Sequence, residues 1–94
     1  MIQGAKLLID ASKVRFTKHA IEKFKLLKHY GFEINEDQVI EAVLNPERID
    51  EKEGQFLATR TLSSRHAIRV VYELRKGFLV IITFYPVRRE RYDL

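Results

Sequence analysis

The C-terminal half of the chain contains three apolar segments separated by very short turns. After Pro46 the apolar pattern loses its helical spacing, and residues 55–62, 66–74 and 78–85, the last of them a nearly continuous apolar run, are predicted to form β-strands. Ser64 and Arg65 form one candidate turn, and Lys76 and Gly77 form the other. Because two-residue loops join neighbouring antiparallel strands, we expect an antiparallel meander.

Two helical patterns precede the strands. Thr17 is a suitable N-cap for the first helix, and Gly31 is suitable as the residue just past its end. Asn35 and Gln38 have the spacing of a capping box at the start of the second helix, and Pro46 ends it. Apolar residues recur at three- and four-residue spacing in both helices, which indicates one buried stripe on each.

Helices grouped before strands favour an α+β fold. We expect one domain over residues 1–94, with both helices on one face of an antiparallel sheet of three or four strands. Residues 48–54 fit either a short polar strand or an extended link. Residues 6–10 fit either a first strand or a short helical turn.

Composition excludes several classes of protein. The chain has no cysteine, so it forms no disulfide and no cysteine-ligated metal site. Its longest apolar run, residues 78–85, is too short to span a membrane. The N-terminus lacks the layout of a signal peptide, so we expect a cytoplasmic protein. The net charge of +4 favours an acidic partner or nucleic acid without choosing between them.

Two-residue turns would fix the strand register. Arg60 would then lie opposite Arg69, and Arg69 opposite Phe84, on the face of the sheet away from the helices. Two opposed arginines repel each other, which favours an anion between them. Alternatively, an acid such as Glu73 or Glu90 neutralises the pair, or the register slips by one residue and reverses every face.

The same register makes the open face apolar. It would carry Arg60, Arg69, Val71, Phe78, Val80, Ile82 and Phe84, while Tyr85 would lie on the helix side. An apolar patch of this kind usually has a cover. A homodimer interface, the N-terminal segment or a dedicated protein partner would each provide one.

Several short motifs, taken in order, resemble a known group of proteins. They are residues 16–20 (Phe-Thr-Lys-His-Ala), 44–47 (Leu-Asn-Pro-Glu), 69–73 (Arg-Val-Val-Tyr-Glu), 81–86 (Ile-Ile-Thr-Phe-Tyr-Pro) and 88–92 (Arg-Arg-Glu-Arg-Tyr). Over residues 14–92 the chain resembles a prokaryotic family of uncharacterised proteins related to BrnT-type and RelE/ParE-type toxins. That superfamily has a strand before its helices, so the resemblance implies a strand within residues 5–16.

The resemblance implies the toxin of a toxin–antitoxin pair, with an antitoxin protein and RNA, including ribosome-bound mRNA, as partners. Such toxins are typically metal-independent endoribonucleases, so no cofactor is expected. The matching positions are His19, Arg69 and the Arg88/Arg89 cluster. Members of the family commonly have an arginine one turn after the His-Ala pair, where this chain has Lys23 and its neighbours.

Metal-independent RNA cleavage needs a base, an acid and cations at the phosphate. Histidine suits proton transfer, arginine suits phosphate and tyrosine donates a proton or stacks on a base. The predicted catalytic residues are His19, Arg69, Arg88 and Tyr85; the predicted RNA-binding residues are Lys23, Arg60, Arg89 and Arg91; the predicted partner-binding residues are Val71, Val80, Ile82 and Phe84. His66 and His29 are weaker candidates, because a turn and a helix C-terminus explain them without function.

Two other functions fit the same fold. One is a non-catalytic module that binds nucleic acid or protein. The other is a ParE-like toxin that binds a topoisomerase and cuts no RNA.

Overall fold

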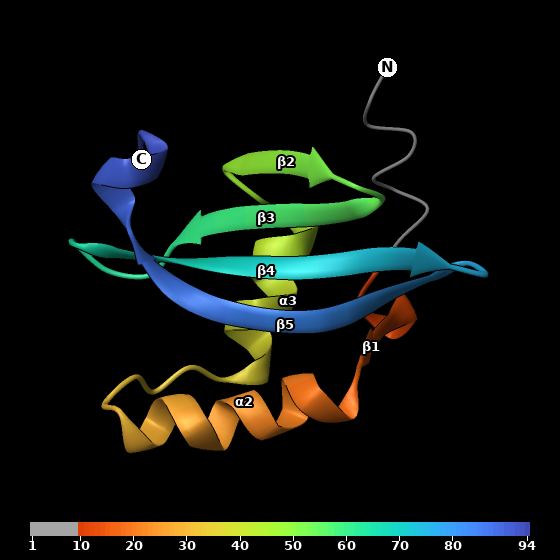
Figure 1. The fold of residues 1–94 in the computed structure, drawn as a ribbon, viewed down its shortest axis with the longest axis horizontal. Coiled ribbons are helices and arrows are strands. Elements are labelled where there is room, and N and C mark those ends of the chain that lie inside the picture. Colours follow the sequence, from red (N-terminus) through yellow and green to blue (C-terminus); the bar gives the residue numbers. More distant parts are fainter. Residues whose placement is uncertain (1–9) are drawn as a thin grey trace.

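The structure of the protein, a computed structural model, describes residues 10–94. A strand and two α-helices come first, four further strands follow, and a 3-10 helix stands at each end (Figure 1). The elements are η1 (Ala11–Lys13), β1 (Val14–Phe16), α2 (Lys18–His29), α3 (Glu36–Leu44), β2 (Arg48–Lys52), β3 (Gln55–Thr61), β4 (His66–Arg75), β5 (Phe78–Arg88) and η2 (Arg89–Tyr92). Apart from residue 10, the undecided segment 6–10 lies outside the described residues.

The strands form one mixed sheet in the order β1-β5-β4-β3-β2. Neighbours from β2 to β5 are antiparallel, whereas β1 pairs with β5 in parallel. The α+β class is confirmed, but the sheet has five strands instead of three or four. The additional strands are β1, which lies within the expected range 5–16, and β2, which occupies the segment 48–54 that the sequence left open.

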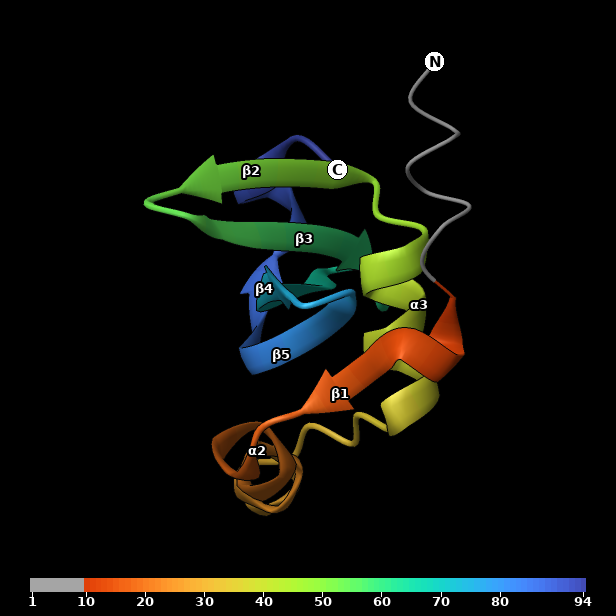
Figure 2. The same ribbon diagram turned by 90° about the vertical axis from the view of Figure 1, so that its right-hand side faces the viewer.

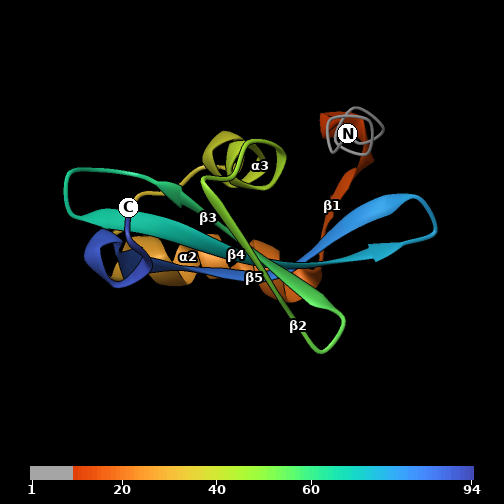
Figure 3. The same cartoon turned by 90° about the horizontal axis from the view of Figure 1, so that it is seen from above.

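The two α-helices cover the sheet from the same side. α3 packs on β3 and β4, and α2 packs on β5 and β1 (Figure 2). The core between them contains Val14, Ala20, Leu27, Val39, Ala42, Val43, Ala58, Ile68, Val70, Tyr72, Leu79, Ile81 and Phe84. Seen from above, η2 and α3 lie on opposite sides of the strands (Figure 3). We call the side that carries η2 the open face.

Thr17 starts α2 and also ties it to β5. Its hydroxyl accepts a hydrogen bond from the Ala20 amide, which confirms the predicted N-cap. The same hydroxyl donates to the Ile82 carbonyl at 3.1 Å, and the Thr17 amide donates to the Ile81 carbonyl at 3.1 Å. One residue therefore fixes where the helix begins and which part of β5 it meets.

The capping box of α3 is confirmed. The Asn35 side chain accepts from the Gln38 amide at 2.9 Å, and the Gln38 side chain accepts from the Asn35 amide at 3.0 Å. The helix ends at Leu44, two residues before Pro46, as the sequence predicts.

The β3–β4 turn differs from the prediction by one residue. Thr61 pairs with Ala67 and Thr59 pairs with Arg69, so Arg60 faces Ile68 instead of Arg69. The amides of Leu62 and Ser63 both donate to the His66 carbonyl, which leaves a three-residue loop, 63–65. The opposed arginine pair is therefore wrong, because the longer loop sends Arg60 to the helix face and leaves Arg69 on the open face.

β5 contains a bulge that the sequence did not predict. The pairing runs from Tyr72–Ile81 directly to Val71–Thr83, so Ile82 is the extra residue. Beyond the bulge, Phe84 enters the core with no exposed surface and packs against Phe24 at 4.6 Å between ring centroids. The predicted place of Phe84 on the open face is therefore wrong, and so is that of Tyr85 on the helix face.

The bulge predicts unequal costs for truncating the two neighbouring aromatic residues. We expect Phe84→Ala to lower the free energy of unfolding by about 3–5 kcal/mol, because it empties a buried site. Tyr85→Ala should cost no more than about 2 kcal/mol, because its ring is only half-buried. Urea denaturation of both variants measures the difference. A larger loss in Tyr85→Ala would contradict the bulged register.

Candidate functional site

His66 and Arg88 are direct cross-strand partners where β4 begins and β5 ends. Side chains opposite each other in an antiparallel pair share one face and lie about 5 Å apart at Cβ. Because η2 follows Arg88 immediately, it brings two more functional side chains to this end of the sheet. The resulting cleft, the His66 cleft, has a volume of about 420 Å³ and is lined by Phe32, His66, Pro86, Val87, Arg88, Arg91 and Tyr92.

The end of α2 supplies the aromatic wall of the cleft. Gly31 adopts a left-handed φ of 91°, which turns the chain after the helix. The Phe32 amide then donates to the Leu27 carbonyl at 2.9 Å. This turn places the Phe32 ring edge-on to the His66 imidazole, with 5.4 Å between ring centroids. The Phe32 ring therefore packs against the His66 imidazole at the cleft.

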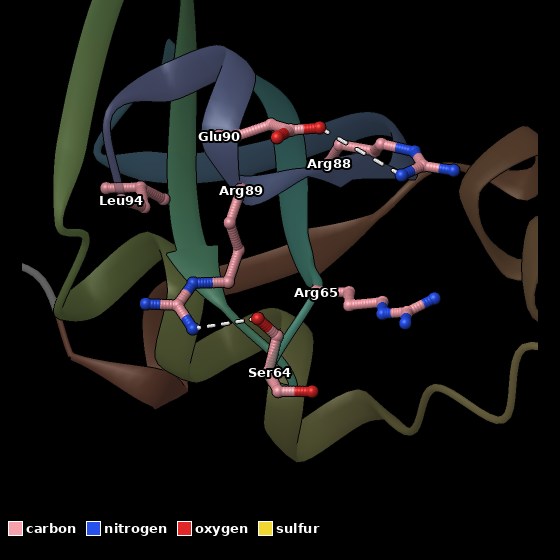
Figure 4. A pocket seen from close by; sticks show the side chains of 6 residues that line it. All are labelled: Ser64, Arg65, Arg88, Arg89, Glu90 and Leu94. Carbon is pink, nitrogen blue, oxygen red and sulfur yellow. Dashed lines mark hydrogen bonds and ion pairs between the residues drawn. The ribbon is translucent and has the colours of Figure 1, made fainter.

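A second cleft of about 330 Å³ adjoins the first and shares Arg88. It is lined by Ser64, Arg65, Arg88, Arg89, Glu90 and Leu94. Figure 4 shows Arg65 and Arg88 projecting to the same side. The Arg88 guanidinium lies 3.9 Å from the Glu90 carboxylate, and both of these side chains are mostly exposed. Within residues 10–94, the Arg65 side chain makes no hydrogen bond or ion pair, and the residue is exposed, so its guanidinium is open to an anionic ligand.

Arg89 has a structural role in the same cleft. Its guanidinium donates to the carbonyls of Ser63 and Ser64, at 3.4 and 3.1 Å, and its amide donates to the Arg65 carbonyl. It therefore fastens η2 to the β3–β4 turn, away from Arg65 and Arg88 (Figure 4). The buried Nε of Arg89 has no hydrogen-bond partner among the described residues. Of the three C-terminal arginines, Arg88 and Arg91 are exposed to ligands, whereas Arg89 points inward.

Arg69 lies in the middle of the open face and is 8% exposed. Its guanidinium donates to the Asp50 carboxylate at 3.1 Å and to the Thr59 hydroxyl at 2.7 Å. The Tyr92 ring covers it, with 4.5 Å between the guanidinium carbon and the ring centroid. One terminal nitrogen of the Arg69 guanidinium and one of its faces are therefore engaged within the protein, which weakens the predicted catalytic role of Arg69.

Asp50 joins two arginines on the open face. Arg48 donates to both of its carboxylate oxygens, at 3.0 and 3.3 Å. These hydrogen bonds lower the pKa of Asp50, partial burial opposes them, and the hydrogen bond from Arg69 lowers the pKa further. The carboxylate therefore stays ionised and holds both guanidinium groups.

His19 is far from this end of the sheet. It is exposed in the first turn of α2, whose N-cap is tied to Ile82. Arg88 follows Ile82 by six residues, a strand length of about 20 Å. α2 runs from β1 toward the His66 end, so its C-terminus, and not His19, lies beside the cleft (Figure 1). The structure does not bring His19 together with Arg69 or Arg88.

Two predicted RNA-binding residues also lie elsewhere. Arg60 is on the helix side, where it donates to the Asn45 carbonyl at 2.6 Å and lies 3.7 Å from the Glu41 carboxylate. It therefore packs along α3. Lys23 is a half-buried residue on α2, one turn after His19.

Three of the four predicted partner-binding residues remain off the core. Val71 and Val80 point to the open face, where Val71 is 8% exposed, and Ile82 sits in the bulge. Among residues 10–94, large exposed apolar side chains lie elsewhere: Ile21, Leu26, Tyr30, Ile49 and Leu74. Tyr85 lies opposite Arg69 on the open face.

His66 is only a weaker candidate from the sequence and Tyr92 is not a predicted site residue, yet both line the His66 cleft. The signal for His66 was its position as the first residue of a strand, because the last residue of the next strand then faces it. The signal for Tyr92 was an aromatic residue within an arginine-rich end. Neither feature places its side chain at the cleft unless the pairing of β4 with β5 is known.

Residues 10–94 contain no group of three or more His, Asp and Glu side chains arranged for a metal ion. None of the helices formed by these residues is long and apolar enough to cross a membrane. A scan of protein-family models found no match to the chain, and searches of curated proteins and of solved structures found none either.

The lowered pKa of Asp50 predicts a pH-dependent contribution to stability. Its charge stabilises the fold above the ordinary carboxyl pKa of about 3.9, and this contribution is lost as the pH falls through the lower folded-state value. We expect Asp50→Asn to be less stable than the native protein near neutral pH. The difference should shrink as the pH falls below the ordinary carboxyl pKa and should vanish once Asp50 is protonated in the folded state.

Urea denaturation across this pH range measures the effect. Glu51→Gln is a matched control, because Glu51 is the next residue of β2 and is exposed. A deficit in Asp50→Asn that stays constant from neutral to acid pH would contradict the assigned role of the carboxylate.

Proposed function

We propose that this protein is the toxin of a toxin–antitoxin pair and that it binds and cleaves single-stranded RNA in the His66 cleft. The observation that carries the proposal is the cross-strand pairing of His66 with Arg88 in a cleft that Arg91 and Tyr92 also line. An imidazole, two exposed guanidiniums and a phenol ring are the groups that this chemistry needs.

The distribution of ion pairs supports an anionic ligand at this place. Arg48, Arg60, Arg69 and Arg75 each lie within 4.0 Å of a carboxylate. Arg88 pairs weakly with Glu90, while Arg65, Arg89 and Arg91 have no such partner within residues 10–94; Arg65 lines the second cleft and Arg91 lines the His66 cleft. Arg15, which also lacks a carboxylate partner, lies over Phe78 at the other end of β5. Three of the four arginines without a carboxylate partner in this part of the chain therefore lie at the His66 end of the sheet, where a phosphate chain would be attracted.

The order of elements supports the same assignment. A strand, two helices and an antiparallel meander follow one another along the chain, as the resemblance to RelE-like toxins implies. The chain adds β2, at the edge of the sheet next to β3. The proposed partner is an antitoxin that contacts the open face near Val71, Val80 and Ile82.

The proposed reaction is a transesterification followed by release of the RNA fragments. His66 takes the proton of a 2′-hydroxyl, and the 2′-oxygen attacks the adjacent phosphorus. Arg88 and Arg91 hold the non-bridging oxygens as negative charge develops. The bond from phosphorus to the 5′-oxygen breaks, and the leaving oxygen takes a proton from water. Tyr92 and Phe32 offer ring surfaces to the neighbouring base.

A non-catalytic RNA-binding module is the second candidate. His66 is the only imidazole that lines the cleft among the described residues, and Arg69 is engaged within the protein. This arrangement supports binding as well as it supports cleavage.

The decisive test incubates the purified protein with mRNA in the presence of EDTA, with and without ribosomes. We expect cleavage to persist in EDTA and to fall by about 100-fold or more in His66→Ala, because a positioned acid or base contributes that much. Arg88→Ala should weaken RNA binding and lower the slope of log K against log salt by about 0.7. Lys25→Ala, an exposed change of charge on α2 outside both clefts, is the control.

The outcomes separate the candidates. RNA that binds but stays intact under every condition would identify the binding module. RNA that neither binds nor is cleaved would contradict both, and binding to a topoisomerase would then be the remaining function to assay.

The position of Glu90 predicts that removing its charge increases the affinity for RNA. Its carboxylate lies beside Arg88, where it competes with an incoming phosphate. We expect Glu90→Gln to tighten binding of a fluorescent single-stranded RNA by roughly 2- to 5-fold, the range that an exposed ion pair accounts for. Glu22→Gln on α2 is the control, and equal effects of the two changes would place the RNA elsewhere.

A further inference from the structure

The C-terminal helix η2 is fastened to the sheet at two points. At its start, Arg89 bonds to the carbonyls of the β3–β4 turn. At its end, the ring of Tyr92 lies over the Arg69 guanidinium on the open face. Between the two points lies Arg91, which lines the His66 cleft together with Tyr92. The position of the cleft wall therefore depends on both attachments.

The second attachment is built from three elements besides η2. Asp50 of β2 and Thr59 of β3 fix the Arg69 guanidinium of β4. Arg48 of β2 adds a hydrogen bond to the Tyr92 carbonyl at 3.3 Å, and its guanidinium lies 5.5 Å from the ring centroid. A guanidinium over an aromatic ring is an attractive contact whose strength grows with burial. Arg69 is almost fully buried, so its contact with the Tyr92 ring is stronger than that of Arg48.

This geometry argues against a direct role for Arg69 at a phosphate. One terminal nitrogen of its guanidinium donates to both Asp50 and Thr59, its face is covered by Tyr92, and 8% of its surface is exposed. The ring of Tyr92 therefore lies between that face of the guanidinium and a ligand on the open face.

We propose that Arg69 is a positioning residue: through the ring of Tyr92 it holds η2 so that Arg91 and Tyr92 line the RNA cleft beside His66. The inference rests on the proposed function of the cleft, and it assigns to Arg69 an indirect contribution to RNA binding. The guanidinium acts on Tyr92, and Tyr92 and Arg91 act on the ligand.

A double-mutant cycle with Arg69→Met and Tyr92→Ala tests the proposal. Methionine keeps an apolar stem of similar length and removes the guanidinium. We expect each single variant to weaken binding of a fluorescent single-stranded RNA by about 5- to 30-fold, the range of a partly buried cation–ring contact. The double variant should be no weaker than the worse single variant, because both changes remove the same contact. Tyr92→Phe should bind nearly as well as the native protein, because it keeps the ring.

Salt dependence separates positioning from direct contact. In an Arg91→Ala background, adding Arg69→Met should leave the slope of log K against log salt unchanged, because the phosphate contact that Arg69 positions is already gone, whereas a direct phosphate contact of Arg69 would reduce the slope by about 0.7 more. A further reduction of the slope in that background, or additive losses in the Arg69→Met/Tyr92→Ala double variant, would overturn the proposal.

Amide hydrogen exchange provides a readout that needs no RNA. The Arg89 amide donates to the Arg65 carbonyl, and the Leu94 amide donates to the Arg89 carbonyl, so both report on whether η2 is docked. We expect both amides to exchange faster in Arg69→Met and in Tyr92→Ala, while the amides of α3 keep their protection. Unchanged exchange would show that Arg69 does not hold η2, even if the native protein binds no RNA.

Discussion

The bulge at Ile82 is the constraint on which the rest of the structure depends. Without the extra residue, the two-residue turn at Lys76 and Gly77 would place His66 opposite Val87 and would send Arg88 to the other face. The bulge is held where Thr17 meets the carbonyls of Ile81 and Ile82. The start of α2 therefore sets the register of β5, and that register brings an imidazole and a guanidinium to one cleft.

On the open face, the guanidiniums of Arg48 and Arg69 share one carboxylate, that of Asp50. A buried guanidinium is costly unless it is paired and hydrogen-bonded. Arg69 obtains a carboxylate from Asp50, a hydroxyl from Thr59 and the ring of Tyr92 on its face. Only a planar cation can donate in its plane and stack on a ring at the same time, so lysine could not replace it. The same contacts that stabilise the buried charge therefore hold the C-terminus against the sheet.

Much of the fold could be predicted from the sequence, because helix caps and turns are local signals. Thr17, the capping box of Asn35 and the Lys76-Gly77 turn all behave as their residue types indicate. The faces of the strands could not be predicted, since a three-residue loop at 63–65 and a bulge each move the pairing by one position. A shift of the pairing by one residue moves each side chain to the opposite face of the sheet. The predicted faces of Phe84 and Arg60 are therefore wrong, although the predicted strands are present.

The extension of β5 to Arg88 gives the three C-terminal arginines different surroundings. A tail beyond Tyr85 would leave Arg88, Arg89 and Arg91 as three equivalent solvated charges. In the structure, β5 continues to Arg88, and the three residues differ: Arg88 faces His66, Arg89 binds turn carbonyls and Arg91 lines the cleft. A run of like charges thus becomes one anchor and two exposed groups at the His66 cleft. The division follows from the backbone, because a strand and a 3-10 helix point successive side chains in different directions.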